Sequence, residues 1–299
     1  MRLRSAVALT LLAACAFTPV APVGAVEGPA RKVPVVGEDK RIGGLSGLAV
    51  LDGGARFVAV SDRGALVEGT FLRDGSALRE ARVTRVTELR GTTGGRLDGN
   101  KVETDAEGLA ITRDGALNIS FEYVHRVAKY RDPSRALPYP ALLRGLGMED
   151  NGGLEALAVD SRDRLVAVPE TGPRGTDLPV LRFEDGQWRK IGLLHPSDGF
   201  APVGADFGPD GRLYLLERAV GAFGFRSRIR RLDFRETGGV FDTAVIWQSG
   251  TGLGNLEGLS IWSDSDGAVH ATMVADDNFS ALLYGGMVTL TLAKSAGTM

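Results

Sequence analysis

A repeat with a period of about fifty residues constrains the fold of this chain more than any other feature of its sequence. Each copy contains a Gly-Leu-Ala-like segment, a tight turn, and an alternating apolar segment that ends in an acidic residue. Five copies are recognisable, and they start at Gly44-Leu45-Ser46, Asp105-Ala106-Glu107, Gly153-Leu154-Glu155, Val203-Gly204-Ala205 and Asn255-Leu256-Glu257. The position that we align across them holds Ser46, Glu107, Glu155, Gly204 and Glu257, in steps of 61, 48, 49 and 53 residues. Such a period predicts repeated units that pack on one another.

Each repeat consists of segments that are typical of β-strands. Residues 56–60 and 212–216 alternate apolar and polar side chains, as half-buried strands do. Asp-Gly pairs recur where a hairpin turn is expected, because glycine supplies the positive φ that such a turn needs. About four such segments per repeat predict the blade of a β-propeller. A two-sheet sandwich or a β-helix is the structural alternative, but neither explains a repeat of this length.

We therefore predict an all-β protein, a single β-propeller over residues 26–299 with blades of about four antiparallel strands. Division of these residues by the repeat length favours six blades, with five as the alternative. In the six-bladed arrangement, residues 31–36 and 287–292 complete a degenerate blade.

Residues 1–25 have the layout of a secretory signal: Arg2 and Arg4, then an apolar run, then small residues. The apolar run is too short to span a bilayer. Two processing sites stay open, namely signal peptidase cleavage after Ala25 and lipoprotein processing at Cys15, the single cysteine of the chain. We expect an exported bacterial protein that is either periplasmic or anchored to the outer membrane through a lipid on Cys15. Without further cysteines, the mature chain has neither disulfides nor thiol catalysis.

The net charge is −2, and it becomes −4 (33 basic against 37 acidic residues) when Arg2 and Arg4 are removed with the signal. This balance argues against nucleic acid as a partner.

Taken together, the repeat motifs resemble the phytase-like family known as "esterase-like activity of phytase", which groups secreted bacterial propeller proteins. The resemblance covers nearly all of the mature chain, and its motifs are Gly44–Leu48, Val60–Gly64, Asp105–Leu109, Gly204–Phe207 with Leu216–Arg218, and Asn255–Leu259 with Asp276–Phe279. It implies hydrolysis of phosphate or carboxyl esters, and therefore a small anionic or ester substrate.

The repeat predicts an acidic ring, since the innermost strand of each propeller blade lines a central channel. The predicted metal ligands are Glu107, Glu155, Asp206 and Glu257. Clustered carboxylates repel one another unless they are protonated or bridged by a cation, and oxygen ligands suit Ca²⁺, the cofactor that we expect. A bound cation would also polarise an ester and acidify a water molecule. The alternative stays open that each carboxylate accepts hydrogen bonds from backbone N–H groups of the neighbouring blade.

A second layer of charged residues ends the adjoining strands and is expected around the same mouth. We predict Asp62, Glu170 and Glu217 as catalytic carboxylates and Arg63 and Arg218 as substrate-binding cations. A guanidinium group can hold a carboxylate or phosphate through two hydrogen bonds. Ion pairs between blades are the alternative role of the two arginines.

The sequence does not favour a serine hydrolase. Ser46 lacks the strand-turn-helix context of a nucleophile elbow, and His125, His195 and His270 share no repeat position. Two functions therefore stay open. One is a metal-dependent hydrolase of phosphate or carboxyl esters, and the other is a non-catalytic propeller of the cell envelope that binds a ligand or a protein partner at the same mouth.

Overall fold

A computed structural model describes residues 26–292 of the chain, except for 76, 98–100, 124–125, 139–152, 173–175, 234–238, 242 and 281–282, and it describes only the backbone of 101–102. The predicted signal sequence, with Cys15, and His125 lie outside the described residues. In the part that the structure describes, no helix combines the length and the apolar character that crossing a membrane requires.

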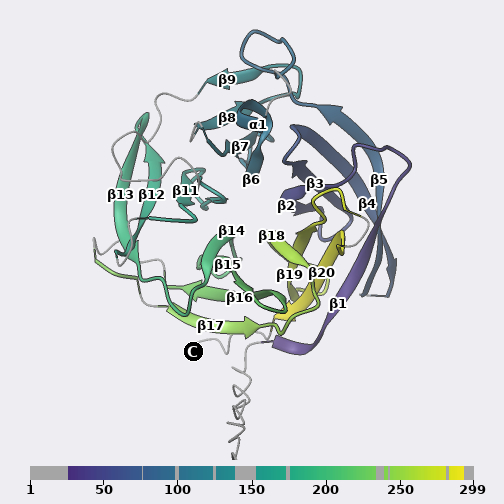
Figure 1. The fold of residues 1–299 in the computed structure, drawn as a ribbon, viewed down its shortest axis with the longest axis vertical. Helices are drawn as coiled ribbons and strands as arrows, with labels where there is room; N and C mark the ends of the chain where they lie inside the picture. Colours follow the sequence, from purple (N-terminus) through teal and green to yellow (C-terminus); the bar gives the residue numbers. More distant parts are fainter. Residues whose placement is uncertain are drawn as a thin grey trace, which may run out of the picture.

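The described strands form five antiparallel groups of four that surround a common axis (Figure 1). Blade 1 contains β2 (Leu45–Leu51), β3 (Arg56–Ser61), β4 (Ala65–Asp74) and β5 (Ala77–Glu88). Blade 2 contains β6 (Ala106–Ile111), β7 (Leu117–Phe121), β8 (Arg126–Tyr130) and β9 (Ala136–Pro138), and the short helix α1 (Lys101–Thr104) precedes it. Blade 3 contains β10 (Ala156–Val159), β11 (Leu165–Val168), β12 (Leu178–Glu184) and β13 (Gln187–Leu194). Blade 4 contains β14 (Ala201–Phe207), β15 (Leu213–Gly221), β16 (Gly224–Leu232) and β17 (Thr243–Gln248). Blade 5 contains β18 (Asn255–Ser263), β19 (Val269–Asp276), β20 (Gly286–Leu292) and β1 (Val26–Val36).

The all-β propeller with four-stranded blades agrees with the prediction, but the favoured count of six blades is not confirmed. The innermost strands β2, β6, β10, β14 and β18 contact one another in that order, and β18 contacts β2, so the ring closes with five. The segments expected to form a sixth blade instead complete blade 5, because β20 pairs with both β19 and β1. The first and last described strands therefore pair in one sheet, where Val26 lies opposite Leu292.

At one level of the ring, four of the five inner strands approach the next strand so closely that a side chain would clash with its backbone. A Cβ atom added to Gly47 would lie 2.7 Å from the carbonyl oxygen of Glu107, and one added to Gly258 would overlap that of Ser46. Gly108 and Gly204 have the same contact with the next blade. Glycine therefore allows the close approach of these four strands, and the fifth, β10, has the small residue Ala156 at this level.

One extra residue bulges out of β2, β6, β14 and β18 next to these glycines. The bulge places Gly204 level with Gly258, and so Val203 corresponds to Glu257. The alignment of Gly204 with Glu257 was therefore shifted by one residue. Bulges of this kind redirect side chains, and they point Glu107 and Glu257 toward the channel mouth.

The hydrophobic core lies between neighbouring blades. On β19, Met273 belongs to the cluster shared with blade 4, whereas the next residue, Val274, belongs to the cluster shared with blade 1. Both side chains are fully buried. Since the blades bury side chains against one another in this way, they form one support for the loops at the mouth, and parallel pairing of β1 with β5 also joins blades 5 and 1 into one eight-stranded sheet.

Candidate functional site

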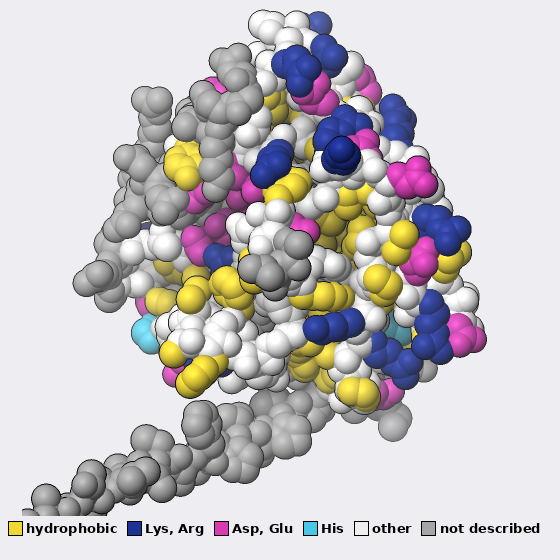
Figure 2. All heavy atoms as spheres, turned by 45° about the vertical axis from the view of Figure 1, so that its right-hand side comes forward, with side chains coloured by type: hydrophobic (Ala, Val, Ile, Leu, Met, Phe, Trp, Pro, Cys, Tyr) yellow, Lys and Arg dark blue, Asp and Glu magenta, His cyan; other side chains and the backbone are white. Residues whose placement is uncertain are grey.

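The acidic side chains lie at the end of the channel where the five inner strands begin, which we call the mouth. A space-filling view shows Asp and Glu side chains gathered in a hollow (Figure 2). Below the mouth, the channel between the inner strands has about 10 Å³ of free space, roughly that of one water molecule. A substrate can therefore reach the acidic residues from the mouth and not through the channel.

Three carboxylates of blade 2 form the tightest group at the mouth. Asp105, Glu107 and Glu122 each offer an oxygen atom, and these three atoms lie within 4.8 Å of one another. Pairing of Ala106 with Phe121 explains the group, because it places the flanking residues Asp105 and Glu122 side by side. The backbone N–H of Glu122 donates to the carbonyl oxygen of Asp105 at 3.0 Å.

Burial destabilises the ionised form of these carboxylates when no cation is bound. The pKa of Glu107 is raised well above its ordinary value, first by burial and then by the negative charges of Glu257, Asp105 and Glu122. An all-oxygen set of carboxylates fits Ca²⁺ or Mg²⁺, and it lacks the nitrogen and sulfur ligands that Zn²⁺ prefers. The residues present therefore fit the cation that the sequence predicts, although two of its ligands, Asp105 and Glu122, were not among the predicted ones.

Arg218 of blade 4 holds a second group of carboxylates at the mouth. Its Nη1 donates to Glu257 Oε1 at 2.5 Å and to Asn255 Oδ1 at 2.7 Å, and its Nη2 donates to Glu170 Oε1 at 3.0 Å. Burial alone would lower the pKa of Arg218, but the charges of Glu257, Glu155 and Glu170 give a net increase. Arg218 is thus engaged by carboxylates of blades 3 and 5, which corresponds to the alternative of an ion pair between blades.

Glu257 and Glu155 carry raised pKa values in this surrounding. Burial is the main cause for Glu257, whose pKa rises to about 7 although Arg218 opposes the increase. Glu257 Oε1 also accepts a hydrogen bond from Asn255 Nδ2 at 2.7 Å, and Oε2 accepts one from Ser46 Oγ at 3.3 Å. The pKa of Glu155 is raised well above its ordinary value by burial and then by Glu170 and Glu107.

Asp206 and Glu217 do not join these groups. Asp206 Oδ2 accepts the backbone N–H of Ile261 in blade 5 at 2.7 Å, and Oδ1 accepts that of Phe207 at 2.8 Å. Burial raises the pKa of Asp206 to about 7 against these hydrogen bonds. This is the contact with a neighbouring blade that the sequence left open as an alternative.

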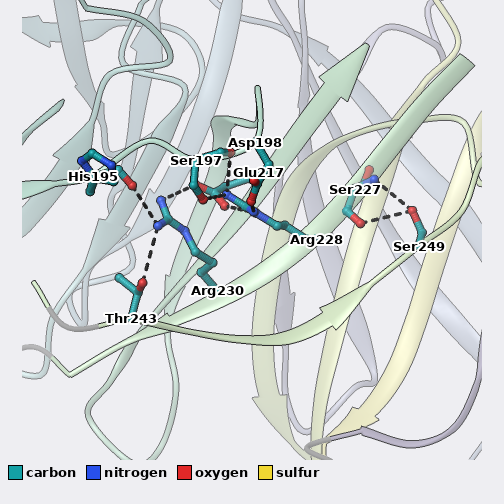
Figure 3. A network of polar contacts seen from close by, with 9 residues as sticks. All are labelled: His195, Ser197, Asp198, Glu217, Ser227, Arg228, Arg230, Thr243 and Ser249. Atoms are coloured by element: carbon teal, nitrogen blue, oxygen red, sulfur yellow. Dashed lines mark hydrogen bonds and ion pairs between the residues drawn. The ribbon is translucent and has the colours of Figure 1, made fainter. Parts of the chain in front are cut away.

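Glu217 lies on the opposite face of β15 from Arg218, because neighbouring residues of a strand alternate. Its side chain is fully buried, and it accepts hydrogen bonds from Arg228 Nε at 2.6 Å and Arg230 Nη2 at 2.5 Å (Figure 3). Arg228 also donates to Ser197 and Asp198, and Arg230 to the carbonyl of His195. The basic stretch of β16 therefore encloses Glu217 within blade 4.

Asp62 and Arg63 follow β3 at the mouth of blade 1. The backbone N–H of Asp62 donates to the carbonyl oxygen of Gly44 at 2.9 Å. Arg63 is exposed, and its guanidinium carbon lies 3.4 Å from the centre of the Phe279 ring, which comes from blade 5. Of the two arginines predicted to bind substrate, Arg63 is the one that faces solvent.

Asp105 and Asn255 are the mouth residues that the sequence reasoning gave no role, although both stand in the quoted motifs. Asp105 directly precedes β6 and lies beside Glu122, which follows β7. Asn255 begins β18 and lies opposite Asp276 at the end of β19. Hairpin pairing was the signal that identifies them, since it brings the start of one strand to the end of the next.

Comparison with known proteins identifies the family of this chain. A sequence profile for phytase-like proteins, described as "Esterase-like activity of phytase", matches residues 40–279. The chain belongs to this family. No curated protein matches this phytase-like chain.

Solved structures that resemble this phytase-like protein do so at low sequence identity. A gluconolactonase from Xanthomonas campestris has 13% identity and a TM-score of 0.46, covering 93% of this chain and 100% of its own. An aldose sugar dehydrogenase from Streptomyces coelicolor has 11% identity and a TM-score of 0.47, with coverage of 90% and 99%. A virginiamycin B lyase from Staphylococcus aureus has 12% identity and a TM-score of 0.42, with coverage of 90% and 74%.

Proposed function

We propose that this phytase-like protein is a divalent-cation-dependent hydrolase of phosphate or carboxyl esters that acts at the channel mouth. The observation that carries the proposal is the group of Asp105, Glu107 and Glu122, whose oxygens lie within 4.8 Å of one another at the channel mouth. Family membership supports the reaction class. Ca²⁺ is the cation that we propose, because it accepts several carboxylate ligands in flexible geometry.

The remaining mouth residues have separate roles in this proposal. A divalent cation supplies polarisation of an ester or phosphoryl oxygen and acidification of a bound water. Glu257 exchanges a proton with the substrate or with water, for which a pKa of about 7 is well suited. Arg218 and Asn255 hold the Glu257 carboxylate in one orientation. Glu155 and Glu170 complete the acidic wall around Arg218.

Hydrolysis by matched variants tests the proposal. Purified protein is assayed on phytate, 4-nitrophenyl phosphate and 4-nitrophenyl butyrate, after chelation and after return of Ca²⁺. We expect calcium-dependent turnover that the substitutions D105N and E107Q reduce at least about 100-fold, in the range of residues that stabilise developing charge. The variant D206N is the control, since Asp206 contacts blade 5 and not the mouth group.

Two outcomes would contradict the proposal. If E107Q has the same turnover as wild type, the carboxylates at the mouth take no part in the reaction. Absence of hydrolysis on every ester, with Ca²⁺ bound, would favour the alternative of a non-catalytic propeller that binds a ligand or a protein partner at the cell envelope.

We also propose export to the periplasm or outer membrane, on the basis of the signal-like layout of residues 1–25. The mass of the mature N-terminus distinguishes the two processing sites. A lipid-modified N-terminal Cys15 indicates an anchor, whereas a chain that starts at Val26 indicates ordinary signal peptidase.

A further inference from the structure

A recess beside the mouth separates blades 1 and 2. Its volume is about 420 Å³, and its walls include Arg63, Glu88, Arg96, Leu97 and Thr104. Thr104 directly precedes Asp105 of the proposed cation group, so the recess opens next to that group. A space of this size accommodates the part of a small substrate that extends from the reacting ester.

Arg63 brings an available positive charge to this recess. Arg96 pairs with Glu88 at 2.7 Å, and the guanidinium of Arg218 is engaged by Glu257 and Glu170. Within the described part of the chain, Arg63 forms no ion pair, and its guanidinium stacks on Phe279 at 3.4 Å. Stacking on an aromatic face leaves the N–H donors at the edge of the guanidinium plane directed away from the ring, where an anion can accept them.

Phe279 is held in place by a strained loop of blade 5. Asn278 and Phe279 have φ values of 48° and 52°, which a bulky side chain rarely adopts. Asp277 Oδ1 stabilises this conformation, because it accepts the backbone N–H of Phe279 at 2.9 Å and that of Gly44 in blade 1 at 3.0 Å. Gly43 provides the room, since a Cβ there would lie 2.9 Å from the Phe279 ring. The loop therefore crosses to blade 1 and fixes the ring against Arg63.

We infer that the recess between blades 1 and 2 binds the anionic end of the substrate, with Arg63 as the anion-binding residue and Phe279 as the residue that positions it. The inference rests on the proposed function and narrows its substrate class. The substrate is an ester that carries a second group, a phosphate or carboxylate, on an apolar portion that lies against the partly exposed Leu97. A neutral ester lacks the interaction with Arg63 and is a poorer substrate.

A binding experiment that needs no turnover tests the recess. Phenylphosphonate, which has an anionic group on an apolar ring and no ester to hydrolyse, is titrated calorimetrically into wild type, R63Q and R79Q. Arg79 is the control, because it is an exposed arginine paired with Asp74 on the outer part of blade 1. We expect R63Q to weaken binding about 10- to 100-fold, as loss of a charge-assisted hydrogen bond does, and R79Q to leave it unchanged. Equal affinity of R63Q and wild type, or no binding to wild type at millimolar concentration, would overturn the inference.

A kinetic experiment tests the positioning role of Phe279. The variants F279A and F279W are compared on 4-nitrophenyl hemisuccinate, which carries a carboxylate, and on neutral 4-nitrophenyl butyrate. We expect F279A to raise KM for the charged ester about tenfold and to change KM for the neutral ester less than about twofold, whereas F279W retains the wild-type values because indole also stacks on guanidinium. Equal changes on both esters would contradict the role of Phe279.

The two experiments separate this inference from the proposed function. If wild type hydrolyses neither ester, the proposed function fails, and the phenylphosphonate titration still decides whether the recess binds an anion. If wild type hydrolyses both esters and R63Q binds phenylphosphonate as tightly as wild type does, the proposed function stands and the inference fails.

Discussion

Replacement of Glu217 by Gln removes a buried negative charge that Arg228 and Arg230 share inside blade 4 (Figure 3). The side-chain exposures are 0% for Glu217, 2% for Arg228 and 4% for Arg230, so solvent cannot replace the lost charge. The amide of Gln can accept a hydrogen bond from one arginine, but its NH₂ group then faces the donors of the other.

The expected cost lies at the lower end of the range for a broken buried ion pair, which is about 3–5 kcal/mol. Arg228 keeps its contacts with Ser197 and Asp198, and its guanidinium lies 4.3 Å from the Phe200 ring. Arg230 keeps the carbonyl of His195. We therefore expect about 3 kcal/mol, which lowers Tm by about 6–12 °C in a domain of this size.

Thermal unfolding and ester hydrolysis are measured on the same samples of wild type, E217Q and E170Q. Glu170 is the matched control, because its side chain is 19% exposed and Arg218 keeps Glu257 as a partner, so E170Q should cost less than E217Q. E217Q below its Tm should retain the wild-type kcat. If E217Q is as stable as wild type but has lost its activity, Glu217 is the catalytic carboxylate that the sequence predicts and the structural role is refuted.

Two further perturbations test the mouth and the ring. In calcium-free buffer Tm should fall as pH rises from about 5 to about 8. The pKa values of Glu257 and Asp206 are raised to about 7 in the folded state, whereas in the unfolded chain they are the ordinary 4.5 and 3.8. Between these values the folded state binds more protons than the unfolded chain, so the free energy of unfolding falls as pH rises. A Tm that rises over the same pH range would contradict the raised pKa values. The substitution G258A should lower the free energy of unfolding in urea by about 1–3 kcal/mol, because the added Cβ overlaps the carbonyl of Ser46. The control G250A, whose Cβ would have no atom within 4 Å, should change it little. Equal stability of the two variants would contradict the close approach of the inner strands.

The repeat predicted the blades because strands and hairpin turns depend on residues that are close together in the sequence. Alternation gives each strand two faces, and Asp-Gly turns fix where hairpins end, so four-stranded antiparallel blades follow from the sequence alone. The number of blades did not follow, because it depends on the pairing of β1 with β20, which lie far apart in the sequence. Spacing cannot show whether β1 and β20 form a blade together or complete the one that β18 and β19 begin.

The predicted acidic ring at the mouth rests on repeat positions, but the partner of each carboxylate depends on details that spacing does not contain. Val203, and not Gly204, stands level with Glu257, and the carboxylate of Asp206 accepts a backbone N–H of blade 5. Adjacency of Glu217 and Arg218 in the sequence suggested a common site, yet strand alternation places them on opposite faces of β15. Asp105 and Glu122 became recognisable as a pair only through the register of β6 and β7.

Calorimetric titration of Ca²⁺ at pH 7, in two buffers that differ in ionisation enthalpy, tests most directly whether Asp105, Glu107 and Glu122 hold a cation together. Since burial and neighbouring charge raise the pKa of Glu107, binding should release protons to the buffer. We expect one site with net proton release in wild type and in D206N, and loss of that site in E107Q. Absence of binding at millimolar Ca²⁺, or unchanged binding in E107Q, would contradict the cation site on which the proposed reaction depends.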